Sequence, residues 1–493
     1  MLKLRSLNFT KSPLTTLALP VCTDHPLTAD PALTAIIDQA RQWQEFSGKP
    51  KERITIYNPA GIRAHRVILS GLGPRAEVTA ESLRLYSGDL VNHAAKGGLT
   101  EITIAAPAPD TLELDTETVL RGLGEGAALA NHAFEHYKSE PDRVILQKID
   151  IAVTRHVSGK YKPLAEEVQT VCEGTLLARH WANLAPNDKP PEILAKEMAA
   201  EARRHKLKVR ILSEKELTRQ KFGALLAVGK GSDKPPRLVL MEHRASGARK
   251  TVALVGKGVT FDTGGINLKP SGSITGMKMD MAGSAAMAAA LITVARLKPR
   301  VNVIGVMPLV ENMPSGRATR PSDIVTAYSG KTIEINNTDA EGRLILADAM
   351  AYVNKKYKPD MIIDMATLTG ACVVALGEKM AGVFSSDDLL SEQLVAAGRR
   401  TFERLWPMPI PEDYLEQLKS DCADISNVSK GRWGGAITAA LFLKEFVGDT
   451  PWAHIDIAGP ASIKKGNAYQ TPGATGFGVR LMWDFIRKLE TGN

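Results

Sequence analysis

Short apolar runs rich in Val and Ile alternate with longer stretches of helical periodicity along nearly the whole of this 493-residue chain. Such alternation is typical of sheets whose neighbouring strands are joined by crossover helices. We expect strands at Leu14–Val21, Ile54–Tyr57, Arg66–Ser70, Glu101–Ala105, Val144–Val153, Lys208–Leu212, Leu238–Glu242, Thr251–Val255, Val301–Val306, Lys331–Ile335, Met361–Met365 and Trp452–Ile457. We expect helices at Pro31–Phe46, Ala76–Lys96, Val119–Tyr137, Lys162–Asn183, Glu192–His205, Gly283–Leu297 and Ile437–Val447. The sequence therefore predicts an α/β protein with a largely parallel or mixed central sheet and helices on both faces.

The length of the chain suggests two domains and is ample for a large buried core. We expect a smaller N-terminal α/β domain over residues 1–160 and a larger α/β/α domain with a central mixed sheet over residues 187–493. Between them, residues 161–186 contain a long helical stretch, which we expect to link the two domains.

Composition and cysteine usage favour an ordinary globular protein of a reducing compartment, so we expect a cytoplasmic location. Hydrophobic residues make up 44% and charged residues 24% of the chain, as in soluble domains. The four cysteines are scattered without a CxxC pair, which indicates neither a disulfide framework nor a cysteine zinc site. The apolar run Leu14–Cys22 is short and contains Pro20, so it predicts the first strand rather than a signal peptide. No stretch approaches the roughly 20 apolar residues of a membrane span, and we expect no membrane contact.

Two carboxylates and an arginine lie at a junction between a predicted strand and a helical pattern, in the run Ile335–Leu346. Asp339, Glu341 and Arg343 alternate, and alternate residues of an extended segment point the same way. Like charges this close repel unless a cation lies between them, and carboxylate oxygens suit divalent metals. The alternative is that the two acids only cap the helix N-terminus.

A second cluster of charged residues occupies Thr251–Ala282 and favours the metal site. Here a short apolar strand ends at Gly256 and is followed by a glycine-containing loop with two acids and two lysines, Lys257, Asp262, Lys269 and Asp280. Loops at strand ends are where functional sites are usually built. A dinucleotide site fails, because the third glycine of GxGxxG falls on Phe261 and no helix opens there.

Together these motifs are similar to those of a known family. The spacing of Lys257, Asp262 and Asp280, with the run NTDAEGRL at Asn337–Leu344, resembles the leucine aminopeptidases, cytosolic exopeptidases with two metal ions. Further matching motifs are Asn183–Asn187, Asn312–Gly316, Ala366–Gly370 and Gly473–Gly478. The resemblance covers residues 165–485, whereas residues 1–160 match only in length and in the alternation of strand and helix. It makes residues 187–493 the catalytic aminopeptidase domain.

The resemblance implies a ligand set for two divalent ions per subunit, Mn²⁺ or Zn²⁺. The ligands would be Lys257, Asp262, Asp280, Asp339 and Glu341, with Asp262 and Glu341 bridging both ions. Lys257 would have to be neutral to donate a lone pair, and burial and a nearby dication both lower a lysine pKa. From the residues alone, the alternative is that Lys257 is an ordinary charged lysine and binds no metal.

The same resemblance implies how the reaction proceeds. A water shared by the two ions would attack the carbonyl of the first peptide bond, and one ion would hold the free α-amine. Lys269 would stabilise the oxyanion, and Arg343 would hold a bicarbonate ion that relays the proton. Without the resemblance, Arg343 reads as an ion-pair partner of Glu341.

Substrate contacts also follow from the resemblance. Five residues would lie at the substrate: Met277, Thr367, Leu368, Gly370 and Ala458. The Leu368 carbonyl and the Gly370 N–H would bind the peptide backbone, and a pocket that contains a methionine suits Leu or Met side chains, so we expect broad specificity with Leu preferred. Trp433 departs from the family, which more often has a small residue before the glycine pair. A tryptophan lining the cleft would narrow the substrate range.

Two further features carry weaker hypotheses. His132-Ala-Phe-Glu-His136 spells the HxxEH zinc motif, and a helix would bring both histidines to one face; the alternative is two incidental histidines on a helix away from the metals. Residues 201–250 hold fourteen Lys and Arg against five Asp and Glu. The alternatives there are a solvated strand edge and an anionic partner such as DNA, which some bacterial members of the family bind. Because the family forms hexamers, we also expect a homohexamer acting on peptide substrates.

Overall fold

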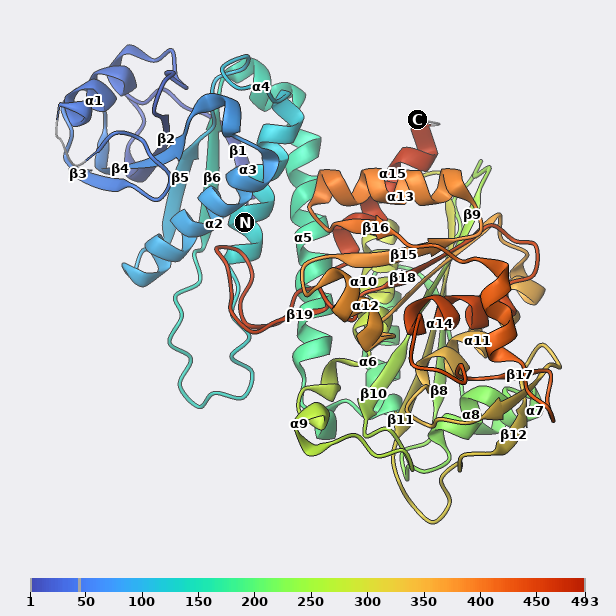
Figure 1. The fold of residues 1–493 in the computed structure, drawn as a ribbon. Helices are drawn as coiled ribbons and strands as arrows, with labels where there is room; N and C mark the ends of the chain where they lie inside the picture. The colour runs from blue at the N-terminus through green and yellow to red at the C-terminus, as the bar shows by residue number, and fades with distance from the viewer. Residues whose placement is uncertain (1, 43–45, 492–493) are drawn as a thin grey trace. The chain divides into compact units, whose positions relative to one another are not determined.

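The computed structural model describes residues 2–42 and 46–491 of the chain. It divides into two compact units, and the boundary between Glu173 and Gly174 falls inside a long helix, α5 (Lys162–Asn183). The first unit also contains Lys465–Pro472. Each unit is built on its own sheet with helices packed against it (Figure 1), which confirms the predicted α/β class and the mixed central sheet of the larger unit.

A six-stranded sheet forms the first unit. In sheet order its strands are β1 (Leu2–Ser6), β6 (Lys148–Val153), β5 (Glu101–Ala105), β2 (Leu14–Cys22), β4 (Ala64–Gly73) and β3 (Arg53–Tyr57). All neighbours are parallel except the β3–β4 hairpin. Its helices are α1 (Pro31–Arg41), α2 (Ala80–Lys96), α3 (Thr116–Ala130), α4 (Arg155–Lys160) and the short η1 (Arg75–Glu77). Apolar residues of α1 pack against β2 and β4 in a buried cluster.

Several expected boundaries in this unit are wrong. The strand β1 precedes Leu14–Cys22, which is therefore the second strand. Helix α3 ends at Ala130 rather than Tyr137, because the side chain of Asn131 donates to the Leu146 carbonyl and accepts the Leu146 N–H, both at 2.8 Å. That bridge also delays the next strand, which begins at Lys148. The expected helix Pro31–Phe46 ends at Arg41, and residues 43–45 of it lie outside the described part of the chain.

The second unit is organised around a nine-stranded mixed sheet. Its path runs β16 (Leu405–Pro407), β15 (Ala381–Ser385), β18 (Trp452–Asp456), β14 (Met361–Ala366), β9 (Thr251–Gly256), β11 (Asn302–Asn312), β8 (Arg237–His243) and β7 (Lys208–Leu212), with β10 (Gly258–Asp262) beside β11. The central strands β18, β14, β9 and β11 are parallel to one another. Their carboxyl ends therefore meet at one edge, where ligands bind in open α/β sheets.

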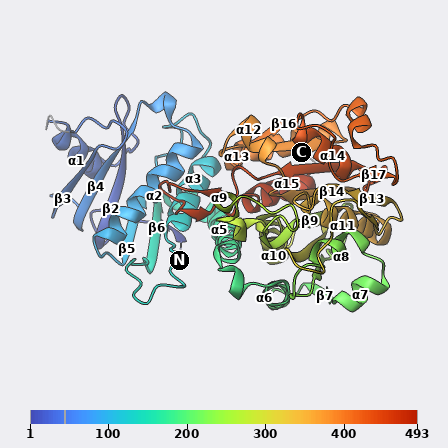
Figure 2. The same ribbon diagram turned by 60° about the horizontal axis from the view of Figure 1, so that its bottom comes forward.

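Helices pack on both faces of this sheet (Figures 1 and 2). Alternate strand residues such as Ala253 and Val255 join a large buried cluster with α11 (Gly342–Tyr357), α8 (Gly223–Gly229) and α14 (Gly435–Lys444). The Ala-rich α10 (Ala282–Leu297) packs against the same strands and against α15 (Val479–Thr491). The remaining helices are α6 (Pro191–Arg204), α7 (Glu214–Arg219), α9 (Ser271–Ile274), α12 (Gly370–Leu376) and α13 (Asp388–Thr401), with short turns η2 (Pro186–Asp188), η3 (Met277–Met279) and η4 (Glu412–Leu418).

Small sheets complete the second unit. The strands β12 (Asp323–Thr326), β13 (Thr332–Ile335) and β17 (Ile425–Ser426) form one, and β19 (Ser462–Ile463) pairs with β20 (Gly473–Ala474) in another. The segment Ser271–Leu297 is long and apolar enough to cross a membrane by length and composition, but 89% of its most apolar window is buried within the protein. Its packing is that of a core helix.

Candidate metal centre and substrate loops

Three carboxylates from separate parts of the sequence converge at the carboxyl edge of the central sheet. Asp262 is the last residue of β10, Asp280 follows η3, and Glu341 is the residue before α11. One oxygen from each lies within 4.8 Å of the others, and all three side chains are buried. The expected extended geometry around Asp339 and Glu341 is wrong: Ala340 N–H donates to the Asn337 carbonyl in a turn, and Glu341 has helical dihedral angles. It is this turn that delivers Glu341 to the cluster.

Lys257 joins these carboxylates from the end of β9. Its Nζ lies 2.8 Å from Asp280 Oδ1 and 2.8 Å from Glu341 Oε1 and donates to the Thr367 carbonyl at 2.8 Å. Space around the side chain is tight, since a Cβ on Gly342 would lie 2.6 Å from Lys257 Cε. The glycine that opens α11 is therefore needed for the lysine to reach the acids.

Lys269 and Asp339 form the open side of the same cluster. Lys269 Nζ lies 2.8 Å from Asp262 Oδ2 and also contacts Asp339 Oδ1. Both side chains are partly exposed, whereas Asp262 is buried. The loop before Lys269 turns through Gly264 at φ +90°, where a Cβ would lie 2.4 Å from the Asn267 carbonyl. The structure thus brings all five predicted ligands and Lys269 into one charged centre.

The electrostatics of the ion-free centre are dominated by burial and by mutual pairing. Burial raises the pKa of Asp280 and of Glu341, and the neighbouring carboxylates raise both further. Burial alone would lower the pKa of Lys257, but Asp280, Glu341 and Asp262 outweigh it, and the pKa is raised. The pKa of Lys269 is raised in the same way by Asp262 and Asp339. Without ions, both lysines serve as the counter-charges of the acids.

The donor set fits divalent cations. Asp280 Oδ2 and Glu341 Oε2 are buried and make no hydrogen bond. Buried carboxylate oxygens are costly without a partner, and hard or borderline cations supply one. Among the described residues, the cluster of Asp262, Asp280 and Glu341 is the group of acids whose oxygens are close enough to share an ion.

Arg343 lies on the first turn of α11 and is buried. Its Nη1 donates to the Asn427 carbonyl at 2.8 Å. Burial lowers the pKa of the guanidinium to about 10, although Glu341 and Asp456 oppose that shift. Glu341 instead makes its direct ion pair with Lys257.

The residues expected at the substrate lie on three segments: the one after β14, the loop after β18 and the turn η3. Thr367, Leu368 and Gly370 follow β14, and Thr367 Oγ1 donates to Asp280 Oδ1 at 2.7 Å. Ala458 follows β18, the neighbouring strand. Met277 opens the turn η3 that ends at Asp280. Thr367 and Met277 are therefore connected directly to the charged centre, whereas Ala458 is held by Asp456.

Trp433 lies in the turn before α14, and its side chain is 75% exposed. The Arg432 guanidinium lies 4.7 Å from the centre of its ring. The turn is near the start of α12, since a Cβ on Gly435 would lie 3.5 Å from the Ala371 side chain. An exposed ring at this place is available to a substrate or to another chain.

Sequence reasoning missed two polar residues that organise the centre. Asn312, at the end of β11, donates to Asp262 Oδ1 at 2.8 Å and to the Thr338 carbonyl at 3.1 Å. Asn312 belongs to the motif Asn312–Gly316, which matches the family, and this match could have marked it as a functional residue. Asp456, at the end of β18, accepts hydrogen bonds from the loop after β14. No local pattern marked it.

The two weaker hypotheses have different outcomes. The histidines of HxxEH are not on a helix, because α3 ends at Ala130, and the shared helical face expected of them is wrong. In the basic stretch, Arg204 pairs with Glu201 at 2.7 Å and Arg210 with Glu216 at 2.9 Å. Such pairs fit a solvated helix end and strand edge, and both alternatives for this stretch stay predictions.

Comparisons with known proteins agree with this architecture. Residues 176–483 match the catalytic domain of the cytosol aminopeptidase family, and residues 20–141 match its N-terminal domain. A "Probable cytosol aminopeptidase" of Cenarchaeum symbiosum (strain A) is 43% identical over 450 residues, 90% of each chain. Another from Brucella ovis is 44% identical over 448 residues, 89% of this chain and 88% of that protein. A solved structure of the bottromycin maturation enzyme BotP in complex with Mn is similar with a TM-score of 0.86 and 34% identity, covering 96% of this chain and 99% of that one.

Fold and site together define a two-domain enzyme of the α/β class whose acidic centre has the donor set for divalent cations. The chain belongs to the cytosol aminopeptidase family. It is a metal-dependent aminopeptidase, of a family that uses two metal ions.

Proposed function

We propose that this enzyme is a leucyl aminopeptidase that removes N-terminal residues from peptides, with Leu preferred over a broad range. The observation that carries the proposal is the buried cluster of Asp262, Asp280 and Glu341, which has unpaired carboxylate oxygens at the carboxyl edge of the sheet. Asp339 and Lys257 complete the set that would hold two divalent ions, Mn²⁺ or Zn²⁺. Bound there, the ions supply an acidified water and polarise the peptide carbonyl.

The protein's own groups have separate tasks in this proposal. Lys269, whose pKa is raised by Asp262 and Asp339, meets the developing charge on the carbonyl oxygen. Arg343 binds a bicarbonate ion that accepts and returns a proton. The Leu368 carbonyl and the Gly370 N–H hold the peptide backbone, and Met277, Thr367 and Ala458 border the side chain of the residue to be released.

The test is hydrolysis of L-leucine amide with and without added Mn²⁺, beside N-acetyl-L-leucine amide. We expect release of ammonia from the free amine substrate, dependence on the metal, and no cleavage of the acetylated control. Cleavage of the blocked substrate would contradict the exopeptidase assignment. The preference for Leu is measured by comparing kcat/KM for the amides of Leu, Met, Phe and Arg.

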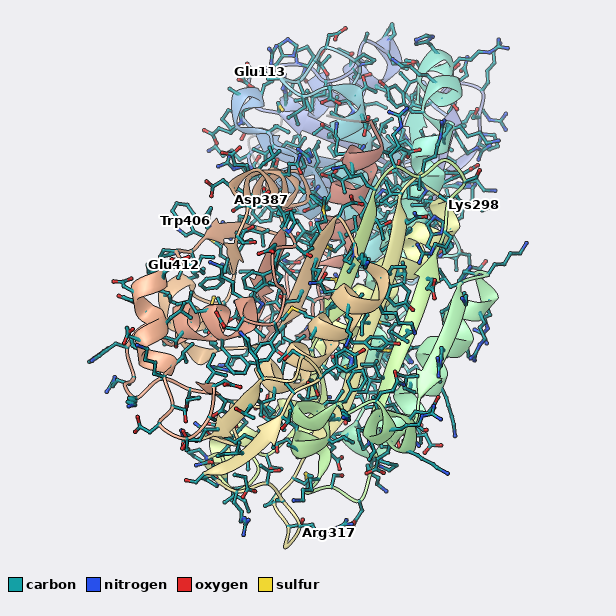
Figure 3. The ribbon with its side chains drawn as sticks, turned by 90° about the vertical axis from the view of Figure 1, so that its right-hand side faces the viewer. Glu113, Lys298, Arg317, Asp387, Trp406 and Glu412 are labelled. Carbon is teal, nitrogen blue, oxygen red and sulfur yellow. The ribbon has the colours of Figure 1, made fainter. Side chains whose placement is uncertain are left out.

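We further propose that the enzyme acts in the cytoplasm as a homohexamer. Large apolar side chains on the second unit are exposed, with Val374 at 90%, Trp433 at 75% and Trp406 at 57%. Figure 3 shows Trp406 at the surface of this unit. These side chains are available for contacts between subunits, and joined into one continuous apolar patch they would mark an association site. Light scattering of the purified protein gives the answer: we expect about six times the 53.2 kDa of one chain, and a monomeric mass would overturn the proposal.

DNA contact is a second candidate role, favoured by the charge of residues 201–250. Arg203 and Lys208 are exposed and Lys206 turns the chain at φ +63° between α6 and β7. A basic surface of this kind attracts phosphate backbones without reading sequence. Catalysis and DNA contact use different residues, so that one chain can perform both.

A further inference from the structure

We infer that Asp456 is a positioning residue that fixes the substrate-backbone loop between β14 and α12 in its binding geometry. The inference rests on the proposed function, because it concerns how the Leu368 carbonyl and the Gly370 N–H are aimed at a peptide. Asp456 itself is fully buried and does not face the substrate.

The hydrogen bonds of Asp456 converge on this loop. Its Oδ1 accepts the Leu368 N–H and the Ala458 N–H, both at 3.1 Å. Its Oδ2 accepts the Thr369 N–H at 3.1 Å and the Thr369 hydroxyl at 2.7 Å. Four donors thus satisfy a buried carboxylate from two loops, and a charged acceptor makes such bonds stronger than a neutral one.

The direction of the two proposed substrate groups follows from these bonds. The peptide plane between Leu368 and Thr369 contains both the Leu368 carbonyl and the Thr369 N–H, and the peptide bond is planar. Fixing the N–H on Asp456 therefore fixes the carbonyl on the opposite side of that plane. Thr369 also caps α12, where its hydroxyl accepts the Cys372 N–H at 3.0 Å, so the position of Gly370, the first residue of the helix, is tied to the same anchor.

The other end of the loop is anchored to the charged centre. The Thr367 carbonyl accepts from Lys257 Nζ, and the Thr367 hydroxyl donates to Asp280. The loop is thus held between the predicted metal ligands on one side and Asp456 on the other. Loss of the Asp456 anchor frees the carbonyl and N–H of the loop while the ligand side stays in place.

The variant that isolates this role is Asp456→Asn, which keeps the size of the side chain. One carboxylate oxygen becomes an NH₂ group, so either the Leu368 and Ala458 pair or the Thr369 pair of donors faces another donor. The matched control is Asp348→Asn. Asp348 is equally buried and accepts backbone N–H groups of Leu225 at 2.9 Å and Tyr328 at 2.6 Å, but it ties α11 to α8 and to the turn before β13.

Steady-state kinetics with two substrates separate positioning from stability. For L-leucine amide we expect KM of Asp456→Asn to rise roughly tenfold, the factor expected from one lost charge-assisted hydrogen bond, with the bound metal unchanged. For L-leucine methyl ester, which has no amide hydrogen for the Leu368 carbonyl, we expect a clearly smaller rise. Asp348→Asn should lower Tm without changing either KM. If Asp456→Asn has a lower Tm but the same ratio of KM for the amide to KM for the ester as wild type, the inference is wrong.

A binding measurement keeps this inference separate from the proposed function. Calorimetry with the reduced dipeptide Leu-ψ(CH₂NH)-Gly, which cannot be hydrolysed, reports backbone binding even in an enzyme that does not turn over leucine amide. Weaker binding to Asp456→Asn than to wild type supports the inference, and equal affinity overturns it. Should Asp456→Asn fail to fold, Thr369→Val removes one of the four donors and is expected to weaken binding in the same direction. Unchanged binding in that variant would overturn the inference as well.

Discussion

Lys257 and Lys269 lie twelve residues apart in one acidic centre and pair with different carboxylates, and the proposed reaction gives them opposite charge states. Lys257 is enclosed by Asp280, Glu341 and Gly342, where a metal ligand must donate a lone pair. Lys269 is 15% exposed and lies on the open side. Position within one cluster, rather than residue type, therefore separates the proposed metal ligand from the proposed oxyanion donor.

The first prediction concerns Lys257→Arg. A guanidinium keeps its charge and is larger than the amine, so we expect the variant to bind fewer ions per subunit and to lose activity. Elemental analysis of metal per chain, read beside kcat, checks this. Lys257→Met, which has no lone pair of comparable basicity, serves as a neutral control and should lose metal as well. Two ions per subunit with normal turnover in Lys257→Arg would remove Lys257 from the ligand set.

The second prediction concerns Lys269→Ala. Removing one oxyanion donor typically lowers kcat by ~10²–10³, and we expect that loss with the metal content unchanged. Lys269→Arg preserves the positive charge and should retain part of kcat. If Lys269→Ala lost its metal, the lysine would be acting as a structural counter-charge for Asp262 and Asp339 instead.

Among elements, the strands β14 and β18 carry a buried ion pair close to the centre. His454 Nδ1 lies 2.7 Å from Asp364 Oδ1, and Trp452 Nε1 donates to Asp364 Oδ2 at 2.7 Å. Burial lowers the pKa of His454, but Asp364 outweighs burial and the pKa is raised above 6.5. The pair therefore joins the two strands most strongly when the imidazole is charged.

The third prediction is the pH dependence that follows from this pair. Because the folded-state pKa is raised, the pair stabilises fully below pH 6.5, and this stabilisation is lost as pH rises through the folded-state pKa. Each unit of the pKa shift corresponds to about 1.4 kcal/mol. We expect the Tm advantage of wild type over His454→Gln to be larger at about pH 5.5 than at about pH 9. A difference in Tm that stays constant with pH would show that His454 is not charged in the folded protein.

The sequence was most informative about elements and least about their ends. Periodicity correctly predicted α5 as Lys162–Asn183 and the strands β9, β14 and β18, because burial imposes those patterns directly. The expectation of a loop directly after Gly256 is wrong, because Gly258–Asp262 forms the strand β10 beside β11. It did not predict the end of α3, which depends on a side-chain bridge from Asn131 to Leu146 fifteen residues away. The convergence of Asp262, Asp280 and Glu341 was expected only through the family motif. The role inferred for Asp456 was not expected at all, since its partners are remote in sequence and local patterns carry no record of them.

The fourth prediction tests the HxxEH motif. Since His132 and His136 follow the end of α3 and do not share a helical face, we expect the double variant His132→Ala/His136→Ala to keep the activity and metal content of wild type. Metal per chain and hydrolysis of leucine amide are the measurements. Loss of one equivalent of metal in the double variant would restore the zinc hypothesis.

For the molecule as a whole, charge is distributed unevenly around a net value of +8. In the centre, four carboxylates face only two lysines, whereas the excess positive charge of the chain lies in residues 201–250. A surface of this kind influences association with anions rather than the fold. We therefore expect that substrate turnover and the proposed contact with DNA can be changed independently.

The last prediction uses that separation. Reversing four charges, Arg203→Glu, Arg204→Glu, Lys206→Glu and Lys208→Glu, should abolish retention on immobilised double-stranded DNA while hydrolysis of leucine amide is unchanged. Wild-type retention should fall steeply as salt is raised, because each phosphate contact releases condensed counterions. Lys3→Glu, Lys11→Glu, Lys51→Glu and Lys96→Glu, at four exposed positions of the first unit, make the same change in net charge and serve as the control. The DNA proposal is wrong if wild type is not retained at low salt, or if the four reversals leave retention unchanged. In that case these residues form only a solvated helix end and strand edge, where ion pairs such as Arg204–Glu201 are made.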